Sequence, residues 1–372
     1  MRHKRVWYIP MDKHEEDRHV NAQSGAGSTA PLTSKYSCEG AFKVVRGEHV
    51  AFRFEIIDSL GNGNFGQVVR CFDHKNRKLV ALKIINNNPL FTRQSLLEVE
   101  VLARLQGGSS RIVRMFEHFK FRHHVCAVFE LLHMNMYEFL LAREFRSLSV
   151  PEIRCIALQL VEALVYLKRI GIVHCDIKPE NILLDRSGSL DVKLIDFGSA
   201  CYAEQTVYTY VQSRFYRAPE VMLGMEYSHP IDMWSLACVL AELSLGAPLF
   251  SGDDEAAILS TIAFRFGAPP NRILMAATNT ERRVEFTVSQ ASSAIERSGT
   301  SRKLAAVDSN QRTSSQSCAA PPIRPRHKSA ISEDVTFDKF LSRALDWDPA
   351  RRLTPEAASR HAWLASALPR CR

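Results

Sequence analysis

Hydrophobic and polar residues follow two different patterns along the chain. In its first third, short clusters of β-branched and aromatic residues alternate with stretches rich in Gly, Asn and charged residues, which is typical of strands. Strands are predicted over residues 54–60, 67–73, 79–85, 112–116 and 125–129. From Asn135 onward apolar residues recur at helical spacing, so helices are expected to dominate the remainder.

Several helices are predicted from this spacing. A helix is expected over residues 93–105, and the clearest pattern covers residues 151–170, where Pro151 suits the first helical turn. The apolar window 234–250 indicates a buried helix, and residues 337–345 resume helical spacing. Five apolar residues share one face of the helix at 151–170: Ile153, Ile156, Leu160, Leu164 and Leu167.

Two segments lack a sustained period. Residues 1–53 contain a linker rich in Ser, Gly and Thr at 22–34 and two apolar patches, at 6–9 and 41–45. Aromatic and β-branched side chains are costly to leave in water, so we expect both patches to dock on the domain that follows, with a disordered tail as the alternative. Residues 271–332 are rich in Ser, Thr, Arg and Pro and are expected to be mostly loop.

Composition points to a large protein with free thiols. The chain has 372 residues and is 46% hydrophobic, so two lobes are expected. Its nine cysteines are odd in number and lack a CxxC pair or a His/Cys cluster, which favours a reducing compartment over a disulfide scaffold or a zinc site. No apolar signal segment follows the basic start, and the window 234–250 is too short to span a bilayer.

The net charge of +8 invites a nucleic-acid interpretation, which the distribution of charge disfavours. Residues 271–330 hold ten Lys and Arg against four Asp and Glu, a surplus of six. Most of the net excess of positive charge therefore belongs to one Ser-rich segment, where solvated loop charge is the simpler account.

The stretch His-Cys-Asp-Ile-Lys-Pro-Glu-Asn at residues 174–181 carries the strongest chemical signal. In phosphoryl transfer from Mg-ATP to a hydroxyl, Asp176 would orient the hydroxyl and accept its proton, and Lys178 would neutralise charge on the moving phosphoryl. The carboxamide of Asn181 would hold a metal ion. Asp196, in the Asp-Phe-Gly that follows an apolar stretch, supplies a carboxylate for the Mg²⁺ that bridges the phosphates.

A glycine-rich stretch precedes this loop. Gly61, Gly63 and Gly66 lie between two predicted strands, where backbone amides can approach a triphosphate without an intervening Cβ. Because a strand follows rather than a helix, the pattern favours a phosphate-covering β-hairpin over a dinucleotide-binding fold.

Lys83 lies inside an apolar predicted strand, where a buried ammonium needs a partner. Glu98 is the expected partner, because it lies on the helix at 93–105 with Leu102 facing the core one turn further on. Glu100 is the rival, on another helical face. Further along, Phe129 is expected at the back of a nucleotide pocket, followed by a hinge.

A regulatory loop is suggested by four residues that lie downstream of the Asp-Phe-Gly sequence. Tyr208 and Tyr210 precede Arg214 and Arg217, and a guanidinium fork matches the oxygens of a phosphotyrosine. The alternative is a structural aromatic loop whose arginines form surface ion pairs.

Three residues are expected to support the site. Asp232, at the start of the buried helix, can accept amide hydrogen bonds from the catalytic loop. Arg352 is predicted to form an internal ion pair with Glu220.

These motifs resemble, in order and spacing, those of a eukaryotic protein kinase over about residues 54–364. The loop 207–217, with His-Cys-Asp in place of the usual His-Arg-Asp, resembles the dual-specificity tyrosine-regulated kinase (DYRK) family, and residues 47–54 resemble its class II branch. With no arginine beside the catalytic Asp176, Arg214 and Arg217 are the expected ligands of a loop phosphate.

The resemblance implies an α+β, two-lobed kinase fold that uses ATP and Mg²⁺. The kinase domain would cover residues 54–364, with an N-lobe at 54–132 and a C-lobe at 133–364, after an accessory region at 1–53 and before a tail at 365–372. The implied nucleotide contacts are Leu60, Gly61, Asn62, Gly63, Asn64, Phe65, Gly66, Val68, Ala81, Lys83, Phe129, Glu130, Leu132 and Leu183.

It also implies an activity. Such kinases autophosphorylate the second tyrosine of Tyr-x-Tyr, here Tyr210, and then phosphorylate Ser or Thr on protein substrates, often before proline. The alternatives are a splicing-type or homeodomain-interacting kinase and a non-catalytic scaffold with a kinase fold. A monomer without membrane or nucleic-acid partners is expected, in the cytoplasm, with basic clusters at 2–5 and 324–328 that would permit nuclear entry.

Overall fold

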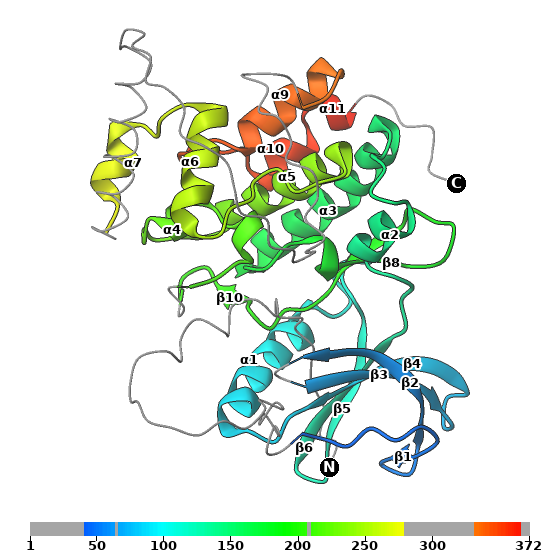
Figure 1. The fold of residues 1–372 in the computed structure, drawn as a ribbon. Coiled ribbons are helices and arrows are strands. Elements are labelled where there is room, and N and C mark those ends of the chain that lie inside the picture. The colour runs from blue at the N-terminus through cyan, green and yellow to red at the C-terminus, as the bar shows by residue number, and fades with distance from the viewer. Residues whose placement is uncertain (1–40, 64–65, 207–209, 279–330, 366–372) are drawn as a thin grey trace, which may run out of the picture.

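The computed structural model describes residues 41–63, 66–206, 210–278 and 331–365. Figure 1 shows two lobes, one built around a β-sheet and the other made mostly of helices. The predicted two-lobed α+β architecture is therefore confirmed.

The N-terminal lobe is built on an antiparallel sheet of six strands in the order β1-β2-β3-β4-β6-β5. Side chains along β2 alternate, with Phe54 and Ile56 buried in the lobe's core and Glu55 more exposed, as expected for a sheet with one covered face. The elements of this lobe are β1 (His49–Val50), β2 (Phe54–Gly63), β3 (Gly66–Asp73), β4 (Lys78–Ile85), α1 (Pro89–Leu105), β5 (Met115–Phe121) and β6 (His124–Glu130).

Phe42 ties the segment before β1 to this sheet. Its side chain is 5% exposed and belongs to the core of the lobe, with its ring 5.4 Å from that of His124. Gln67 Nε2 donates a hydrogen bond of 2.7 Å to the carbonyl of Phe42. The predicted docking of the patch at 41–45 is confirmed for Phe42, and the patch at 6–9 lies outside the described residues.

Phe42→Ala is expected to lower the free energy of unfolding by about 3–5 kcal/mol, because a buried phenyl group is replaced by a cavity. Phe52→Ala is the matched control, since Phe52 is 95% exposed and its truncation should cost less than about 0.5 kcal/mol. Urea denaturation of both variants measures the difference. Equal losses would contradict the docking of Phe42.

The C-terminal lobe is mainly helical. Its helices are α2 (Met136–Ala142), α3 (Val150–Ile170), α4 (Pro219–Met222), α5 (Pro230–Leu245), α6 (Glu255–Phe266), α7 (Asn271–Ala276), α9 (Val335–Ala344), α10 (Pro355–Ser359) and α11 (Ala362–Ala365), with 3₁₀ turns η2 (Pro179–Asn181) and η3 (Arg214–Tyr216). Four short strands pair as β7 (Ile172–Val173) with β10 (Cys201–Tyr202) and β8 (Ile182–Leu184) with β9 (Val192–Leu194).

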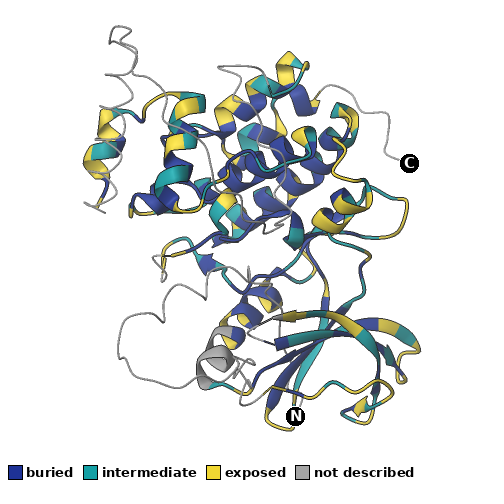
Figure 2. Ribbon diagram, in the orientation of Figure 1, coloured by how far each residue is buried: buried dark blue, intermediate teal, exposed yellow. Residues whose placement is uncertain are grey.

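Two long helices form the centre of this lobe, as Figure 2 shows by their burial. Helix α3 begins where the backbone N–H and hydroxyl of Ser149 donate to Glu152, and it ends at Gly171, whose φ of 78° is the left-handed conformation that glycine adopts readily. All five predicted face residues of α3 are buried. Helix α5 is mostly apolar and is buried along nearly its whole length, as its hydrophobic window predicted.

The structure corrects three predicted boundaries. The strand predicted at 112–116 is β5, which begins at Met115, because Ile112 forms a parallel bridge with Leu194 of the other lobe. Helix α1 begins at Pro89 rather than at residue 93, since proline is well placed in a first helical turn. The segment predicted as mostly loop from residue 271 opens with α7, and residues 279–330 lie outside the described part.

The cysteine prediction holds in part. Five described cysteines are buried free thiols: Cys71, Cys126, Cys175, Cys201 and Cys238.

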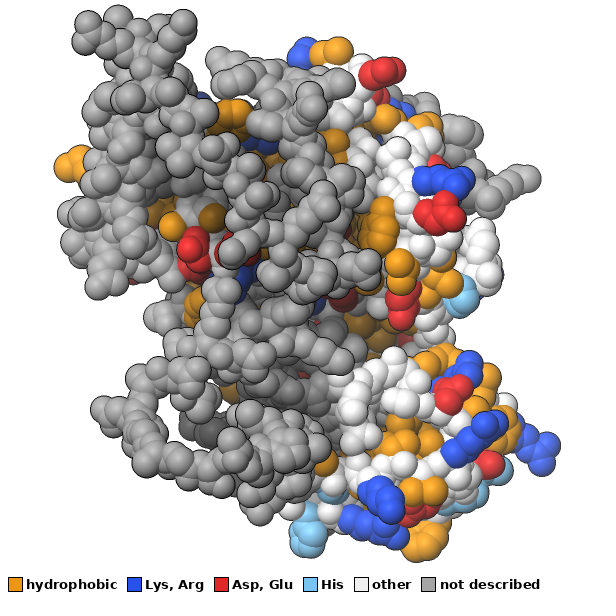
Figure 3. All heavy atoms as spheres, in the orientation of Figure 1, with side chains coloured by type: hydrophobic (Ala, Val, Ile, Leu, Met, Phe, Trp, Pro, Cys, Tyr) orange, Lys and Arg blue, Asp and Glu red, His pale blue; other side chains and the backbone are white. Residues whose placement is uncertain are grey.

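Two further properties concern the surface and hydropathy. No helix among the described residues is both long and apolar enough to cross a membrane. On the face shown in Figure 3, Lys and Arg side chains of the described surface lie interspersed with Asp and Glu.

Candidate active site

A cavity of about 300 Å³ is lined by residues of both lobes. Val68 and Ala81 of the sheet contribute to one wall, and Leu183 of β8 to another. Eight of the expected nucleotide contacts line it: Leu60, Val68, Ala81, Lys83, Phe129, Glu130, Leu132 and Leu183. An apolar cavity with a few charged groups at one end suits a nucleotide, whose base is flat and whose phosphates are charged.

The glycine-rich hairpin is present, with Gly63 paired to Gly66 at the end of the β2–β3 ladder. Gly61, Asn62 and Gly66 are not among the described residues that line the cavity, and Asn64 and Phe65 lie outside the described residues. The backbone of β4 supplies a further reason for Gly66, because a Cβ there would come within 2.3 Å of the carbonyl oxygen of Ile84.

Lys83, Glu98 and Asp196 meet at the charged end of the cavity. Lys83 Nζ lies 3.8 Å from Asp196 Oδ1, and Glu98 interacts electrostatically with the same ammonium. Lys83 and Glu98 are each 3% exposed, whereas the rival Glu100 is exposed. Glu98 is therefore the glutamate of α1 that faces the site, and Lys83 forms its ion pair with Asp196.

Burial has the largest effect on the pKa values of these three residues. It lowers the pKa of Lys83 to about 8 despite the attraction of Asp196 and Glu98. It raises the pKa of Asp196 to about 6 and that of Glu98 well above its ordinary value, although Lys83 opposes both shifts. Two carboxylates thus share one ammonium away from water, and additional positive charge would favour their ionised forms.

The catalytic loop is held by Asp232 of α5. Its carboxylate accepts hydrogen bonds from the backbone N–H of His174 at 2.8 Å and of Cys175 at 3.0 Å, so the predicted contact is present. Cys175 has a φ of 65°, an unusual backbone angle for a residue with a side chain, and these bonds help to maintain it. Burial raises the pKa of Asp232 to about 7, which the two N–H donors partly oppose.

His174 orients the neighbouring loops as a neutral imidazole. Its Nε2 donates to the carbonyl of Ile195 at 3.0 Å, and its Nδ1 accepts from the backbone N–H of Asp176 at 3.2 Å. Burial lowers the pKa of His174 to about 4, so the ring remains neutral at physiological pH. The ring also packs edge-on against Phe197, 4.8 Å away, which links the loop to the Asp-Phe-Gly turn.

Asp176 is the centre of a hydrogen-bond network. Lys178 Nζ lies 2.9 Å from Asp176 Oδ2, and Asn181 Nδ2 donates to the same oxygen at 3.0 Å. Ser213 donates to Oδ1 through its backbone N–H at 3.1 Å and its hydroxyl at 2.9 Å, while that hydroxyl accepts from Lys178 at 2.8 Å. Burial alone would raise the pKa of Asp176, but Lys178 and Ser213 outweigh it and lower the pKa. The carboxylate is therefore ionised and fixed in orientation.

Asn181 and Asp196 offer oxygens suited to a metal ion. Among the described residues, Asn181 Oδ1 and Asp196 Oδ2 are buried oxygens that accept no hydrogen bond. Carboxylate and amide oxygens are the ligands that Mg²⁺ prefers, and an ion there would supply the positive charge that Asp196 and Glu98 lack. These residues therefore fit the Mg²⁺ implied by the motifs.

The predicted phosphotyrosine residues are only partly brought together. The guanidinium of Arg217 lies 3.9 Å from the centroid of the Tyr210 ring, and Tyr210 is 56% exposed. Arg217 also donates to the carbonyls of Val211 and Gln212 and forms an ion pair with Glu255. Arg214 donates to the carbonyl of Asp253 at 2.6 Å. Tyr208 lies outside the described residues.

Glu220 and Arg352 form the predicted buried ion pair. Arg352 Nη1 and Nη2 donate to the two carboxylate oxygens of Glu220 at 2.6 and 2.8 Å, and both side chains are 0% exposed. Arg352 also donates to the carbonyls of Pro230 and Asp346. This pair fixes α4, and with it the end of the activation segment, to the C-terminal part of the lobe.

Several site residues escaped sequence analysis. Ser213 contacts Asp176, and Glu255 contacts Arg217. No sequence motif indicates these contacts, because each joins segments far apart in the chain. Gln212 is buried, with a φ of 67°, and bonds Ile231, Ser235 and Ala218. Apolar pattern could have suggested some further residues that line the cavity: Leu102, Val113, Leu131, Met134 and Ile195. It carries no signal for the polar residues of the lining: His133, Asn135, Glu138 and Glu180.

Comparison with known proteins agrees with this geometry. The family model "Protein kinase domain" matches residues 54–364, and the chain belongs to the protein kinase family.

Three similar relatives are all kinases of one group. The chain is 40% identical over 341 residues to dual specificity tyrosine-phosphorylation-regulated kinase 3 of Homo sapiens, covering 89% of this chain and 57% of the relative. It is 39% identical over 357 residues to dual specificity tyrosine-phosphorylation-regulated kinase mbk-2 of Caenorhabditis elegans, covering 94% and 43%. The DYRK-family kinase pom1 of Schizosaccharomyces pombe is 41% identical over 330 residues, covering 87% and 29%. The predicted resemblance to this family is confirmed, although the chain spans only about half or less of each relative's length.

Proposed function

We propose that this chain is an ATP-dependent dual-specificity protein kinase that phosphorylates Tyr210 of its own activation loop and then Ser or Thr on protein substrates. The observation that carries the proposal is the network around Asp176, where Lys178, Asn181 and Ser213 hold an ionised carboxylate beside the cavity. None of the residues that phosphoryl transfer requires is replaced, which argues against a non-catalytic scaffold.

Each residue has a role in the proposed reaction. Lys83, kept in place by Glu98, contacts the ATP phosphates, and Asn181 with Asp196 holds Mg²⁺, which when bound neutralises charge on the phosphates. Asp176 orients the substrate hydroxyl and accepts its proton, as general bases do. Lys178, whose Nζ lies beside the carboxylate of Asp176, stabilises the transferring phosphoryl.

The regulatory step is proposed at Tyr210. The exposed ring stacks on Arg217, so a phosphate on its hydroxyl would lie near the guanidinium of Arg217. To bind that phosphate, Arg217 would exchange its ion pair with Glu255 for a charge-assisted bond to phosphate oxygens. The purely structural role of Arg217 is the alternative, and it is favoured by the carbonyls that Arg217 already binds.

Tyr210→Phe is expected to lower substrate phosphorylation about tenfold, the equivalent of one charge-assisted hydrogen bond to the loop phosphate. Tyr208→Phe, in the same loop, is the control and should retain activity. Initial rates on a Ser/Thr peptide library compare the variants. Equal rates for the wild type and Tyr210→Phe would leave Arg217 with its structural role alone.

Mass spectrometry tests the function itself. The chain is expressed in bacteria, and its phosphorylation is mapped by intact mass and by peptides, with Asp176→Asn as the inactive reference. Phosphate on Tyr210 in the wild type and none in the variant is the expected result. Folded wild-type protein without phosphate and without turnover of added substrate would favour the scaffold.

The remaining proposals concern the whole protein. We expect a monomer that acts on protein substrates, with Ser or Thr before proline and arginine upstream, in the cytoplasm with access to the nucleus. Residues 1–53 are proposed as the accessory region for tyrosine autophosphorylation, ahead of a kinase domain at 54–364, and the docking of Phe42 on the sheet supports such a role. A splicing-type or homeodomain-interacting kinase would differ in substrates and would be recognised by a different peptide preference.

A further inference from the structure

Three potential metal ligands meet at one end of the N-terminal sheet, outside the nucleotide cavity. His49 of β1 is the direct cross-strand partner of Glu55 of β2. On β3, Phe72 is the partner of Glu55, and His74 follows two residues later. Because side chains alternate along a strand and cross-strand partners share a face, all three ligand residues lie on the same side of the sheet.

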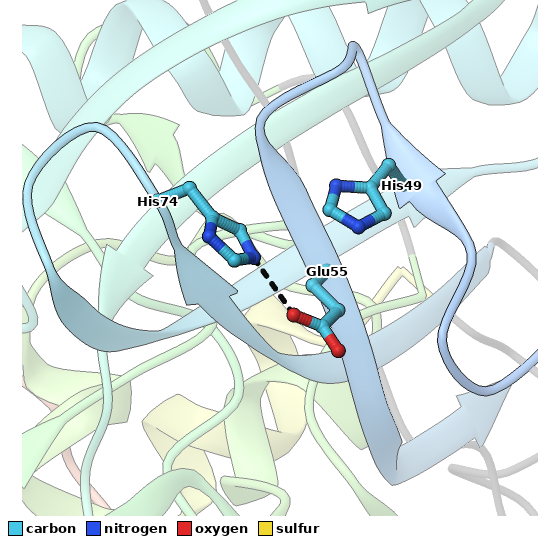
Figure 4. A group of neighbouring side chains, drawn as sticks. All are labelled: His49, Glu55 and His74. Carbon is cyan, nitrogen blue, oxygen red and sulfur yellow. Dashed lines mark hydrogen bonds and ion pairs between the residues drawn. The ribbon is translucent and has the colours of Figure 1, made fainter.

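The side chains are already close together, as Figure 4 shows. His74 Nε2 and Glu55 Oε2 are 2.7 Å apart, and the imidazole rings of His49 and His74 stack with centroids 5.1 Å apart. One ligand atom from each residue can be chosen so that all three lie within 4.8 Å of one another. Zinc ligands at about 2.0–2.2 Å in tetrahedral geometry lie roughly 3.3–3.6 Å apart, so shifts of about 1 Å would complete the arrangement.

The backbone around the cluster is well supported. Ile56 N–H donates to the carbonyl of Glu48 at 3.0 Å, and His74 N–H donates to the carbonyl of Arg53 at 3.1 Å. The ring of Phe72 packs edge-on against His74, 5.0 Å away. The three ligand residues therefore project from fixed positions, and only their exposed side chains need to turn.

A neighbouring arginine has its charge balanced outside the cluster. Arg53, whose carbonyl accepts from the N–H of His74, forms ion pairs of 2.7 Å with both Asp73 and Glu117. Its charge is thus balanced by carboxylates outside the cluster. Glu55 remains as the carboxylate for a metal ion, joined by two imidazoles.

We propose that His49, Glu55 and His74 form a binding site for Zn²⁺. Two imidazoles and one carboxylate are a ligand set that suits Zn²⁺, with water in the open position, and they disfavour Mg²⁺, which prefers oxygen ligands. The absence of a CxxC pair, which argued against a cysteine-based zinc site, does not bear on this one. Its ligands come from β1, β2 and the turn after β3, and their proximity becomes visible only through the strand register.

A bound metal ion would link the β1 segment to the kinase domain that follows it. His49 lies before residue 54, where the match to the protein kinase domain begins, while Glu55 and His74 lie within it. Bound Zn²⁺ would therefore fasten the β1 segment, and Phe42 upstream of it, to β2 and the turn after β3. The proposal is independent of phosphoryl transfer, because none of the three residues lines the nucleotide cavity.

Calorimetric titration of the tag-free chain with ZnCl₂, in excess Mg²⁺ to occupy the site at Asn181 and Asp196, tests the proposal. One saturable zinc equivalent is expected to disappear, or to bind at least about tenfold more weakly, in His49→Asn, His74→Asn and Glu55→Gln. Glu55→Gln is informative because it retains a hydrogen-bond acceptor for His74. His123→Asn, an exposed histidine at the turn between β5 and β6 of the same lobe, is the matched control and should bind as the wild type does.

Hydrogen exchange supplies the structural readout. Zn²⁺ is expected to slow exchange of amides in residues 47–56 of the wild type and of His123→Asn, but not of His74→Asn. Zinc binding that is unchanged in all three ligand variants, or the absence of any saturable binding by the wild type, would overturn the proposal. In either case the contact between His74 and Glu55 would be a surface hydrogen bond alone.

Discussion

Asp176→Asn is expected to lower the rate of phosphate transfer to both Tyr210 and added substrates by about 10²–10⁴-fold, the usual contribution of a general base. The carboxamide cannot accept the hydroxyl proton, and its NH₂ group would face the donors Lys178 and Ser213. ADP release and intact-mass measurements follow the two activities. Thermal unfolding should remain cooperative, because the loop is still held by Asp232.

Asp191→Asn is the matched control for this experiment. Asp191 lies just before β9, its side chain is 41% exposed, and it contacts Ser189 and Arg111 rather than the cavity. The same chemical change there should leave both activities within about twofold. Retention of near-normal turnover by Asp176→Asn would remove the base role from Asp176.

Arg352→Met is expected to lower the free energy of unfolding by about 3–5 kcal/mol, the cost of leaving a buried charge without its partner. Glu220 would keep its carboxylate in a position that is 0% exposed, with both former donors gone. The fluorescence of Trp234 reports the change, because the Arg352 guanidinium lies 5.1 Å from its ring. Urea unfolding followed at this tryptophan gives the midpoint for each variant.

Two comparisons isolate the effect of charge burial. Arg122→Met removes an exposed ion pair with Glu48 and should cost no more than about 1 kcal/mol. The double variant Glu220→Gln/Arg352→Met should be less destabilised than the sum of the single variants, since no unpaired charge remains. Additive losses would mean that the two side chains stabilise the lobe independently.

Local sequence pattern was sufficient for most elements. Helix α3 was predicted because its apolar face repeats without interruption, and β2 to β4 because their branched and aromatic residues cluster between turns. The strand at 112–116 was misplaced for a reason that no local pattern contains. The N–H of Val113 donates to the carbonyl of Leu194 in the other lobe, and the N–H of Leu194 donates to the carbonyl of Arg111, so only the later residues enter the sheet.

The candidate site likewise contains residues that local spacing predicted and residues that it did not. Asp176, Lys178 and Asn181 lie within a few residues of one another, so their spacing alone indicated a shared role. Ser213, which completes the network around Asp176, comes from a segment 37 residues later. The ion pair of Lys83 with Asp196, which adds to the expected electrostatic interaction of Lys83 with Glu98, likewise depends on how the lobes meet.

The buried pair of Glu220 and Arg352 also sets an order of events during synthesis. The two residues are 132 positions apart, so at about 5–20 residues per second the arginine follows the glutamate from the ribosome by roughly 7–26 s. During that interval α4 and α5 carry a carboxylate whose final position has no cation. The ion pair that fixes α4 to the C-terminal part of the lobe therefore cannot form until the segment with Arg352 has emerged from the ribosome.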